Sequence, residues 1–81
     1  MPLASFYLYF PDENGARAAG TRLQGSGYDV EVRLGADDVN WLALAEKDIP
    51  EGDLDTIEAD LGRLAEELNG EYDGHEIDVS S

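Results

Sequence analysis

The chain has 81 residues, enough for one domain with a thin hydrophobic core, and 42% hydrophobic residues is too high a fraction for a disordered chain. It contains no cysteine, which excludes disulfides, thiolate metal sites and a cysteine nucleophile and favours the reducing cytoplasm. The 19 acidic and 5 basic residues give a formal net charge of −14, so direct binding to nucleic acid or to an anionic membrane is not expected.

The same acidity makes a basic protein surface the electrostatically favoured partner. An equally simple interpretation is that the charge only keeps a small protein soluble. No apolar run reaches the roughly 20 residues that a membrane span needs, and the N-terminal sequence does not have the pattern of a signal peptide. We therefore expect a soluble, cytoplasmic protein.

The first predicted element is a strand over residues 4–10, which is rich in aromatic residues and ends at Pro11, because proline cannot donate to a sheet ladder. Alternation of side chains places Phe6, Leu8 and Phe10 on one face and Tyr7 and Tyr9 on the other.

A helix is predicted next, ending at Gln24, with Asp12 or Asn14 as its N-cap. The Gly-Ser-Gly run at 25–27 ends it, since glycine tolerates the left-handed conformation of a helix C-terminus. The residues expected to face the sheet are small, so this helix can lie close to it: Ala16, Ala19, Gly20 and Leu23.

Two strands follow, over residues 28–34 and 39–46, joined by a turn at 35–38. The first alternates apolar residues with Asp29, Glu31 and Arg33, which is typical of a half-buried strand. The second is apolar on both faces and should therefore be central in the sheet. Its faces carry Leu42 and Leu44 on one side and Trp41, Ala43 and Ala45 on the other.

The last two elements are a long amphipathic helix over residues 54–69, with Asn69 and Gly70 at its end, and a strand over residues 72–79. In that strand Ile77 and Val79 should point inward and Gly74 should mark a bulge.

The order β-α-β-β-α-β in so short a chain predicts an α+β, ferredoxin-like fold, with residues 1–81 as a single domain. A four-stranded antiparallel sheet then carries two helices on one face, because crossover connections are right-handed. The other face of the sheet is left open to solvent or to a partner.

No catalytic, cofactor-binding or metal site is predicted, and the chain is expected not to be an enzyme. His75 is the only histidine, and alternation turns Glu76 away from Asp73 and His75, whereas a metal site needs three or four converging ligands. Motifs for nucleotide binding or a nucleophile elbow are absent from the sequence.

The open face is the candidate binding surface. Alternation assigns to it the aromatic residues Tyr7, Tyr9 and Trp41, joined by Tyr72, with the carboxylates of Asp29, Glu31 and Glu76 around them. An exposed aromatic patch is typical of an interface, although the rings could instead only pair across strands and cover the sheet. Similar folds stack RNA bases on such rings, but the carboxylates here argue for a protein partner or a second copy.

Several segments recur together in one known family. Residues 70–74 (Gly-Glu-Tyr-Asp-Gly) follow residues 64–68 (Leu-Ala-Glu-Glu-Leu), and residues 27–32, the strand containing Trp41 and the aromatic run 6–10 precede them. This set resembles the ribonuclease E inhibitor RraB family over nearly the whole chain, with residues 70–74 as the most specific part. The resemblance implies a ferredoxin-like core and a non-enzymatic protein that binds ribonuclease E and restrains RNA decay.

Two alternatives remain open at this point. The open aromatic face could bury against a second copy, giving a homodimer with some other regulatory role. A small-molecule binder or enzyme is disfavoured, because a pocket of roughly 300 Å³ or more would displace much of so small a core.

Overall fold

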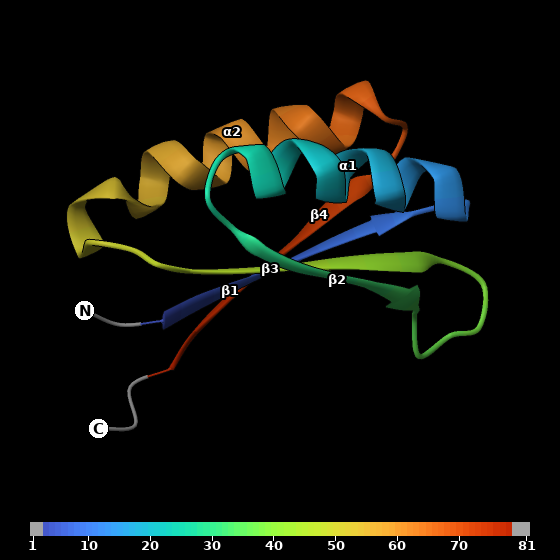
Figure 1. The fold of residues 1–81 in the computed structure, drawn as a ribbon, viewed down its shortest axis with the longest axis horizontal. Helices are drawn as coiled ribbons and strands as arrows, with labels where there is room; N and C mark the ends of the chain where they lie inside the picture. Colours follow the sequence, from blue (N-terminus) through green and yellow to red (C-terminus); the bar gives the residue numbers. More distant parts are fainter. Residues whose placement is uncertain (1–2, 79–81) are drawn as a thin grey trace.

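The structure is a computed structural model that describes residues 3–78, and it confirms the α+β, ferredoxin-like fold. The elements in chain order are β1 (Leu3–Phe10), α1 (Glu13–Gly25), β2 (Asp29–Leu34), β3 (Trp41–Asp48), a short 3₁₀ turn (Glu51–Asp53), α2 (Leu54–Glu67) and β4 (Glu71–Asp78). The strands form one antiparallel sheet in the order β2-β3-β1-β4, so β1 and β3 are central as predicted. Both helices cover the same face of this sheet (Figure 1).

The hydrophobic core lies between the sheet and the two helices. Strand β1 contributes its largest members, since Phe6, Leu8 and Phe10 are at most 1% exposed. Helix α1 contributes the predicted stripe, Ala16, Ala19, Gly20 and Leu23. Gly20 brings α1 close to β2, because a Cβ atom there would lie 3.1 Å from Val30 Cγ1. Small residues on the helix and large ones on the strand therefore fill the same thin layer.

The helix ends follow standard capping chemistry. The Asp12 carboxylate accepts a hydrogen bond of 2.8 Å from the Gly15 amide, so Asp12 is the N-cap of α1 and Asn14 is not. Both helices end in Schellman motifs, with Gly27 (φ 93°) and Asn69 (φ 62°) in the left-handed conformation. The long helix stops at Glu67, two residues before the predicted end, because that motif begins there.

Several predicted strand bounds differ from the observed ones by one or two residues: β1 begins one residue earlier, β2 one residue later, and β3 ends two residues later. β3 begins at Trp41 rather than at residue 39, because the Asp37 carboxylate accepts hydrogen bonds of 3.0 Å from the amides of Val39 and Asn40 and holds them in the turn. β4 begins one residue earlier than predicted, at Glu71, and the predicted inward position of Val79 lies outside the described residues.

The predicted bulge in β4 is confirmed. The pairing of β4 with β1 shifts between Tyr7 and Leu8, so that Asp73 is an extra residue between Tyr72 and Gly74. Gly74 has φ 116°, a conformation that L side chains rarely adopt. As a result, the side-chain alternation of β4 reverses at this point.

Candidate interaction surface

The face of the sheet opposite the helices, called the open face below, is set by β1 and its pairing. Tyr7 and Tyr9 point to it because Phe6 and Leu8 are buried under the helices, as predicted. Residues paired directly across an antiparallel sheet share a face. The register therefore places on the open face Leu3, Ser5, Tyr7 and Tyr9 from β1, Leu42, Leu44, Glu46 and Asp48 from β3, Asp29, Glu31 and Arg33 from β2, and Glu71, Gly74 and Glu76 from β4.

The centre of the open face is apolar with polar contacts at its sides. Tyr7 pairs with Leu44, and its hydroxyl donates a hydrogen bond of 2.9 Å to the Glu76 carboxylate. That hydrogen bond, together with burial, raises the pKa of the Tyr7 phenol above its ordinary value. The Ser5 hydroxyl donates to Glu46 over 3.1 Å. The tyrosine ring is thus held in place over the sheet by a carboxylate from a neighbouring strand.

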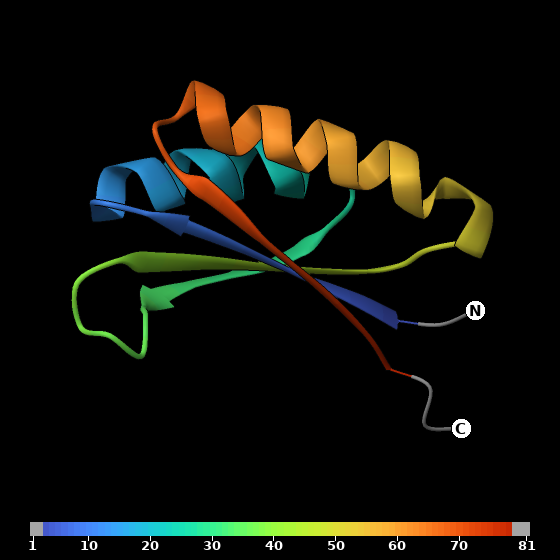
Figure 2. The same cartoon turned by 180° about the vertical axis from the view of Figure 1, so that it is seen from behind.

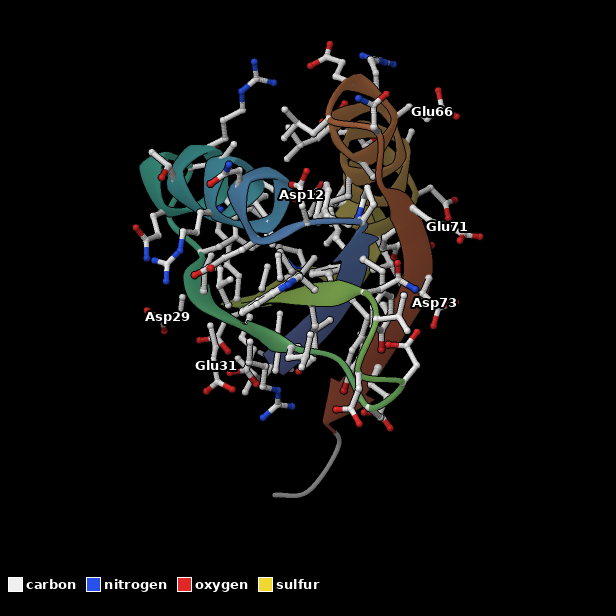
Figure 3. All side chains as sticks on the ribbon, turned by 90° about the vertical axis from the view of Figure 1, so that its right-hand side faces the viewer. Asp12, Asp29, Glu31, Glu66, Glu71 and Asp73 are labelled. Carbon is white, nitrogen blue, oxygen red and sulfur yellow. The ribbon has the colours of Figure 1, made fainter. Side chains whose placement is uncertain are left out.

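The charge of this face is strongly one-sided. Among the side chains that the structure describes, it carries six carboxylates, from Asp29, Glu31, Glu46, Asp48, Glu71 and Glu76, which we call the acidic rim. Arg33 is the one cation on the same face in residues 3–78, and its guanidinium lies 2.9 Å from Glu31. Figure 3 shows the rim at both edges of the sheet, with Asp29 and Glu31 on β2 and Glu71 on β4. The predicted placement of Asp29, Glu31 and Glu76 around the tyrosines is therefore correct.

The predicted placement of Trp41 is wrong. Trp41 pairs with Phe10 and packs, half-buried, against the core on the helix side. Both faces of β3 are apolar, so the composition of the strand alone could not say which one meets the helices. The small residues Ala43 and Ala45, both fully buried, lie under the helices because β1 already fills that layer with its phenylalanines.

The predicted placement of Tyr72 is also wrong, and the bulge is the reason. Tyr72 pairs with Leu8 and packs against the core, whereas unbroken alternation from Ile77 would have turned it outward. Its hydroxyl donates a hydrogen bond of 2.8 Å to Glu58 on α2. The aromatic part of the open face is therefore Tyr7 and Tyr9 alone.

The sequence reasoning missed Leu44 and Glu46, which lie beside Tyr7 and Ser5 on the open face. The sizes of the side chains in β3 could have predicted this placement. Burying the bulky side chains of both central strands under two close helices would overfill the layer, so the strand with alanines on one face should turn those alanines inward.

The loop between β2 and β3 closes one end of the open face. Figures 1 and 2 show this loop bending away from the helices. A Cβ atom at Gly35 would lie 3.3 Å from the Tyr9 ring, and Leu42, next to Tyr9, is only 4% exposed. The amides of Asn40 and Val39 lower the pKa of the Asp37 carboxyl that holds this loop.

A depression of about 320 Å³ lies beside the loop and is lined by Tyr9, Ala36, Asp37, Asn40, Glu71 and Asp73. Of its three carboxylates, that of Asp37 is already occupied by the loop amides. The depression is continuous with the open face at Tyr9 and Glu71, so we treat it as part of that surface.

A second group of titratable side chains lies on the helix side, between α2 and β4. The Glu58 Oε2 atom accepts from the Tyr72 hydroxyl and lies 2.7 Å from His75 Nδ1. Because a carboxylate can only accept, Nδ1 carries the hydrogen. The hydrogen bond from Tyr72, and after it the contact with His75, lower the pKa of the Glu58 carboxyl. The pKa of the Tyr72 hydroxyl is raised mainly by burial and next by its hydrogen bond to Glu58. Tyr72 and His75 thus share one oxygen of Glu58 as their partner.

Within residues 3–78, no group of three or more histidine and acidic side chains is arranged to hold a metal ion. Neither helix of this part of the chain combines the length and the apolar character needed to cross a bilayer.

Comparison with known families identifies a match over nearly the whole chain. The sequence model of the family described as Regulator of ribonuclease activity B, RraB, matches residues 3–77, from the first residue of β1 to the penultimate residue of β4. A comparison with curated proteins finds no match. The matched region includes all the described residues of the open face. The chain thus belongs to the RraB family of regulators of ribonuclease activity.

Proposed function

We propose that this chain binds a ribonuclease of the ribonuclease E kind through the open face and restrains its activity without catalysing a reaction itself. Family membership supports a ribonuclease as the target. The observation that carries the choice of surface is the apolar centre at Tyr7 and Leu44 with the acidic rim around it. Arg33, the one cation of this face within residues 3–78, is already paired with Glu31.

The two parts of this surface would contribute differently to binding. Apolar and aromatic side chains at the centre of an interface supply most of the affinity once water is excluded from them. The acidic rim would steer a basic patch of the ribonuclease toward the face and would mainly raise the association rate. Since ribonucleases bind a polyanion, they present basic surface, which complements the rim. A chain without cysteine that acts on such an enzyme also fits the cytoplasm.

The alternative use of the open face, as a contact with a second copy, is less well supported. Two copies joined through this face would bring acidic rim against acidic rim, with six carboxylates and one arginine on each side among the described side chains. Like charges brought together at an interface cost several kcal/mol. The loss of Trp41 and Tyr72 from the face also removes half of the aromatic residues that favoured self-association.

Charge reversal on the rim tests the proposal. We expect Asp29→Lys combined with Glu76→Lys to weaken binding to purified ribonuclease E about tenfold or more at low salt, and to relieve inhibition of RNA cleavage equally. The matched control is Asp55→Lys combined with Glu66→Lys on exposed positions of α2, which changes the net charge by the same amount. It should change binding less than about threefold.

Titration calorimetry at two salt concentrations measures both effects. The wild-type complex should weaken as salt rises, because screening reduces the attraction between rim and partner. Equal losses in both double variants would mean that only net charge matters, and no binding to the ribonuclease at low salt would contradict the proposal itself. Affinity capture from lysate followed by mass spectrometry would then identify a different target.

A further inference from the structure

The outer edge of β2 is a second surface with a use of its own. The strand order β2-β3-β1-β4 leaves one side of β2 and one side of β4 without a strand neighbour in residues 3–78. The β4 edge is interrupted by the bulge at Asp73 and Gly74, which disrupts the ladder. β2 is regular over its six residues and is the edge at which a further strand could pair.

The sequence of β2 is complementary to itself in the antiparallel direction. Reading outward from Val32, the neighbours are Glu31 on one side and Arg33 on the other, followed by Val30 and Leu34. If two copies pair about a two-fold axis through Val32, each Glu31 lies opposite Arg33 of the second copy. Each Val30 then lies opposite the second copy's Leu34. Cross-strand pairs of these kinds stabilise a sheet.

Neighbouring registers are much less favourable. Directly opposed residues in an antiparallel pair point to the same face of the sheet. The two-fold axis between the two β2 strands must therefore lie between two copies of the same residue, because an axis midway between residues would oppose neighbours that point to opposite faces. An axis through Glu31 or through Arg33 brings two like charges directly together. An axis through Val30 places Asp29 opposite Glu31 of the second copy. An axis through Glu31 also places Asp29 opposite Arg33 of the second copy, but among these registers the axis through Val32 is the one that pairs opposite charges without bringing like charges directly together.

The side chains of β2 are exposed at this edge, and Glu31 and Arg33, which lie 2.9 Å apart within each copy, would also face their counterparts in the second copy. Glu31 and Arg33 are 59% and 58% exposed, and Leu34 is 43% exposed, which is unusual for a large apolar residue of this chain. On the helix side, Val30 and Val32 line a groove of about 150 Å³ between α1 and β2. In the paired arrangement, Leu34 of the second copy would lie beside Val30 at this groove and lose its exposure to water.

We propose that β2 is the self-association site of this chain and pairs with β2 of a second copy to form one continuous eight-stranded sheet. The open faces of the two copies then lie side by side and remain free. The inference does not rest on ribonuclease binding, and the two respond to salt in opposite ways. Each copy carries a net charge of −14, so screening strengthens contact between copies and weakens contact with a basic partner.

Charge exchange across the axis tests this arrangement in the full chain. By sedimentation velocity at about 500 mM salt, the wild type should dimerise more tightly than at about 50 mM. Arg33→Glu alone, and Glu31→Arg alone, should each weaken the dimer at least about tenfold, because like charges then face each other twice. The double variant Glu31→Arg with Arg33→Glu restores the pairing and should dimerise as the wild type does.

Two controls make the result specific. Arg63→Glu, on the exposed surface of α2, changes the net charge as Arg33→Glu does and should leave the dimer unchanged. A mixture of the Glu31→Arg and Arg33→Glu chains should form a heterodimer, since one chain then presents two positive charges to two negative charges on the other. A wild type that stays monomeric at high salt, or single variants that dimerise normally, would overturn the inference.

Discussion

Replacing Gly70 with alanine is expected to destabilise the fold by about 2–3 kcal/mol, the upper part of the range for overpacking a filled site. Gly70 is the last residue of the Schellman motif of α2, and its amide donates to the Ala65 carbonyl. A Cβ atom on Gly70 would overlap the Phe10 ring and lie 2.5 Å from the carbonyl oxygen of Tyr9. Phe10 is 1% exposed and the backbone of β1 is central in the sheet, so neither can move aside easily. Thermal unfolding should show a midpoint about 10–20 °C lower than that of the wild type.

Gly62→Ala is the matched control for this effect. Gly62 lies within α2, and a Cβ atom there would meet nothing within 4 Å. Alanine is favoured over glycine inside a helix by about 1 kcal/mol, so this variant should be more stable than the wild type. If Gly70→Ala unfolds at the wild-type temperature while Gly62→Ala behaves as expected, the close packing of Gly70 on β1 is wrong.

The second large effect is expected at Glu58. Glu58→Gln should lower the free energy of unfolding by about 1–2 kcal/mol at neutral pH, because the charged acceptor for Tyr72 and His75 becomes a neutral one. Glu66→Gln on the exposed side of the same helix should change it by less than about 0.5 kcal/mol. Denaturant titrations of the three proteins give both numbers.

The effect of Glu58 depends on pH in a defined direction. The hydrogen bond from Tyr72, with that from His75, lowers the pKa of Glu58 from its ordinary value of 4.5. A carboxyl with a lowered pKa stabilises the folded state above its unfolded pKa, and this contribution is lost as the pH falls through the folded value. The difference between the wild type and Glu58→Gln should therefore be full above about pH 5.5 and shrink below about pH 4.5. A difference that stays constant down to about pH 3 would contradict this assignment.

The fold could be predicted from the sequence because each element carries its own signals. Strand β1 has Phe6, Leu8 and Phe10 on one face, two tyrosines on the other, and a proline at its end, so the sequence itself indicates which face is buried. Helix α1 has a single stripe of small residues between an aspartate cap and a Gly-Ser-Gly stop. These local preferences agree with one arrangement of the whole chain.

The candidate surface was only partly predictable, because two of its strands lack a local signal for which way they face. Trp41 and Leu42 are adjacent and both apolar, so only the packing of β3 under the helices decides between them. In β4 the sequence does indicate a bulge at Gly74, but the reversal it imposes on Tyr72 depends on which residue is left unpaired. Both errors concern the face of the sheet to which side chains point, and a shift of one residue in the alternation reverses that face for every side chain.

The loop between β2 and β3 has a consequence for the direction in which a bound segment can lie. It blocks the end of the open face at Tyr9 and Leu42, while the end at Ser5 and Glu46 has no such barrier among the described residues. A partner chain bound over Tyr7 would therefore be blocked at the Tyr9 end of the open face and could extend only beyond the Ser5 end. A longer loop would cover more of the open face and leave a smaller area for a partner, while the sheet beneath would keep its geometry.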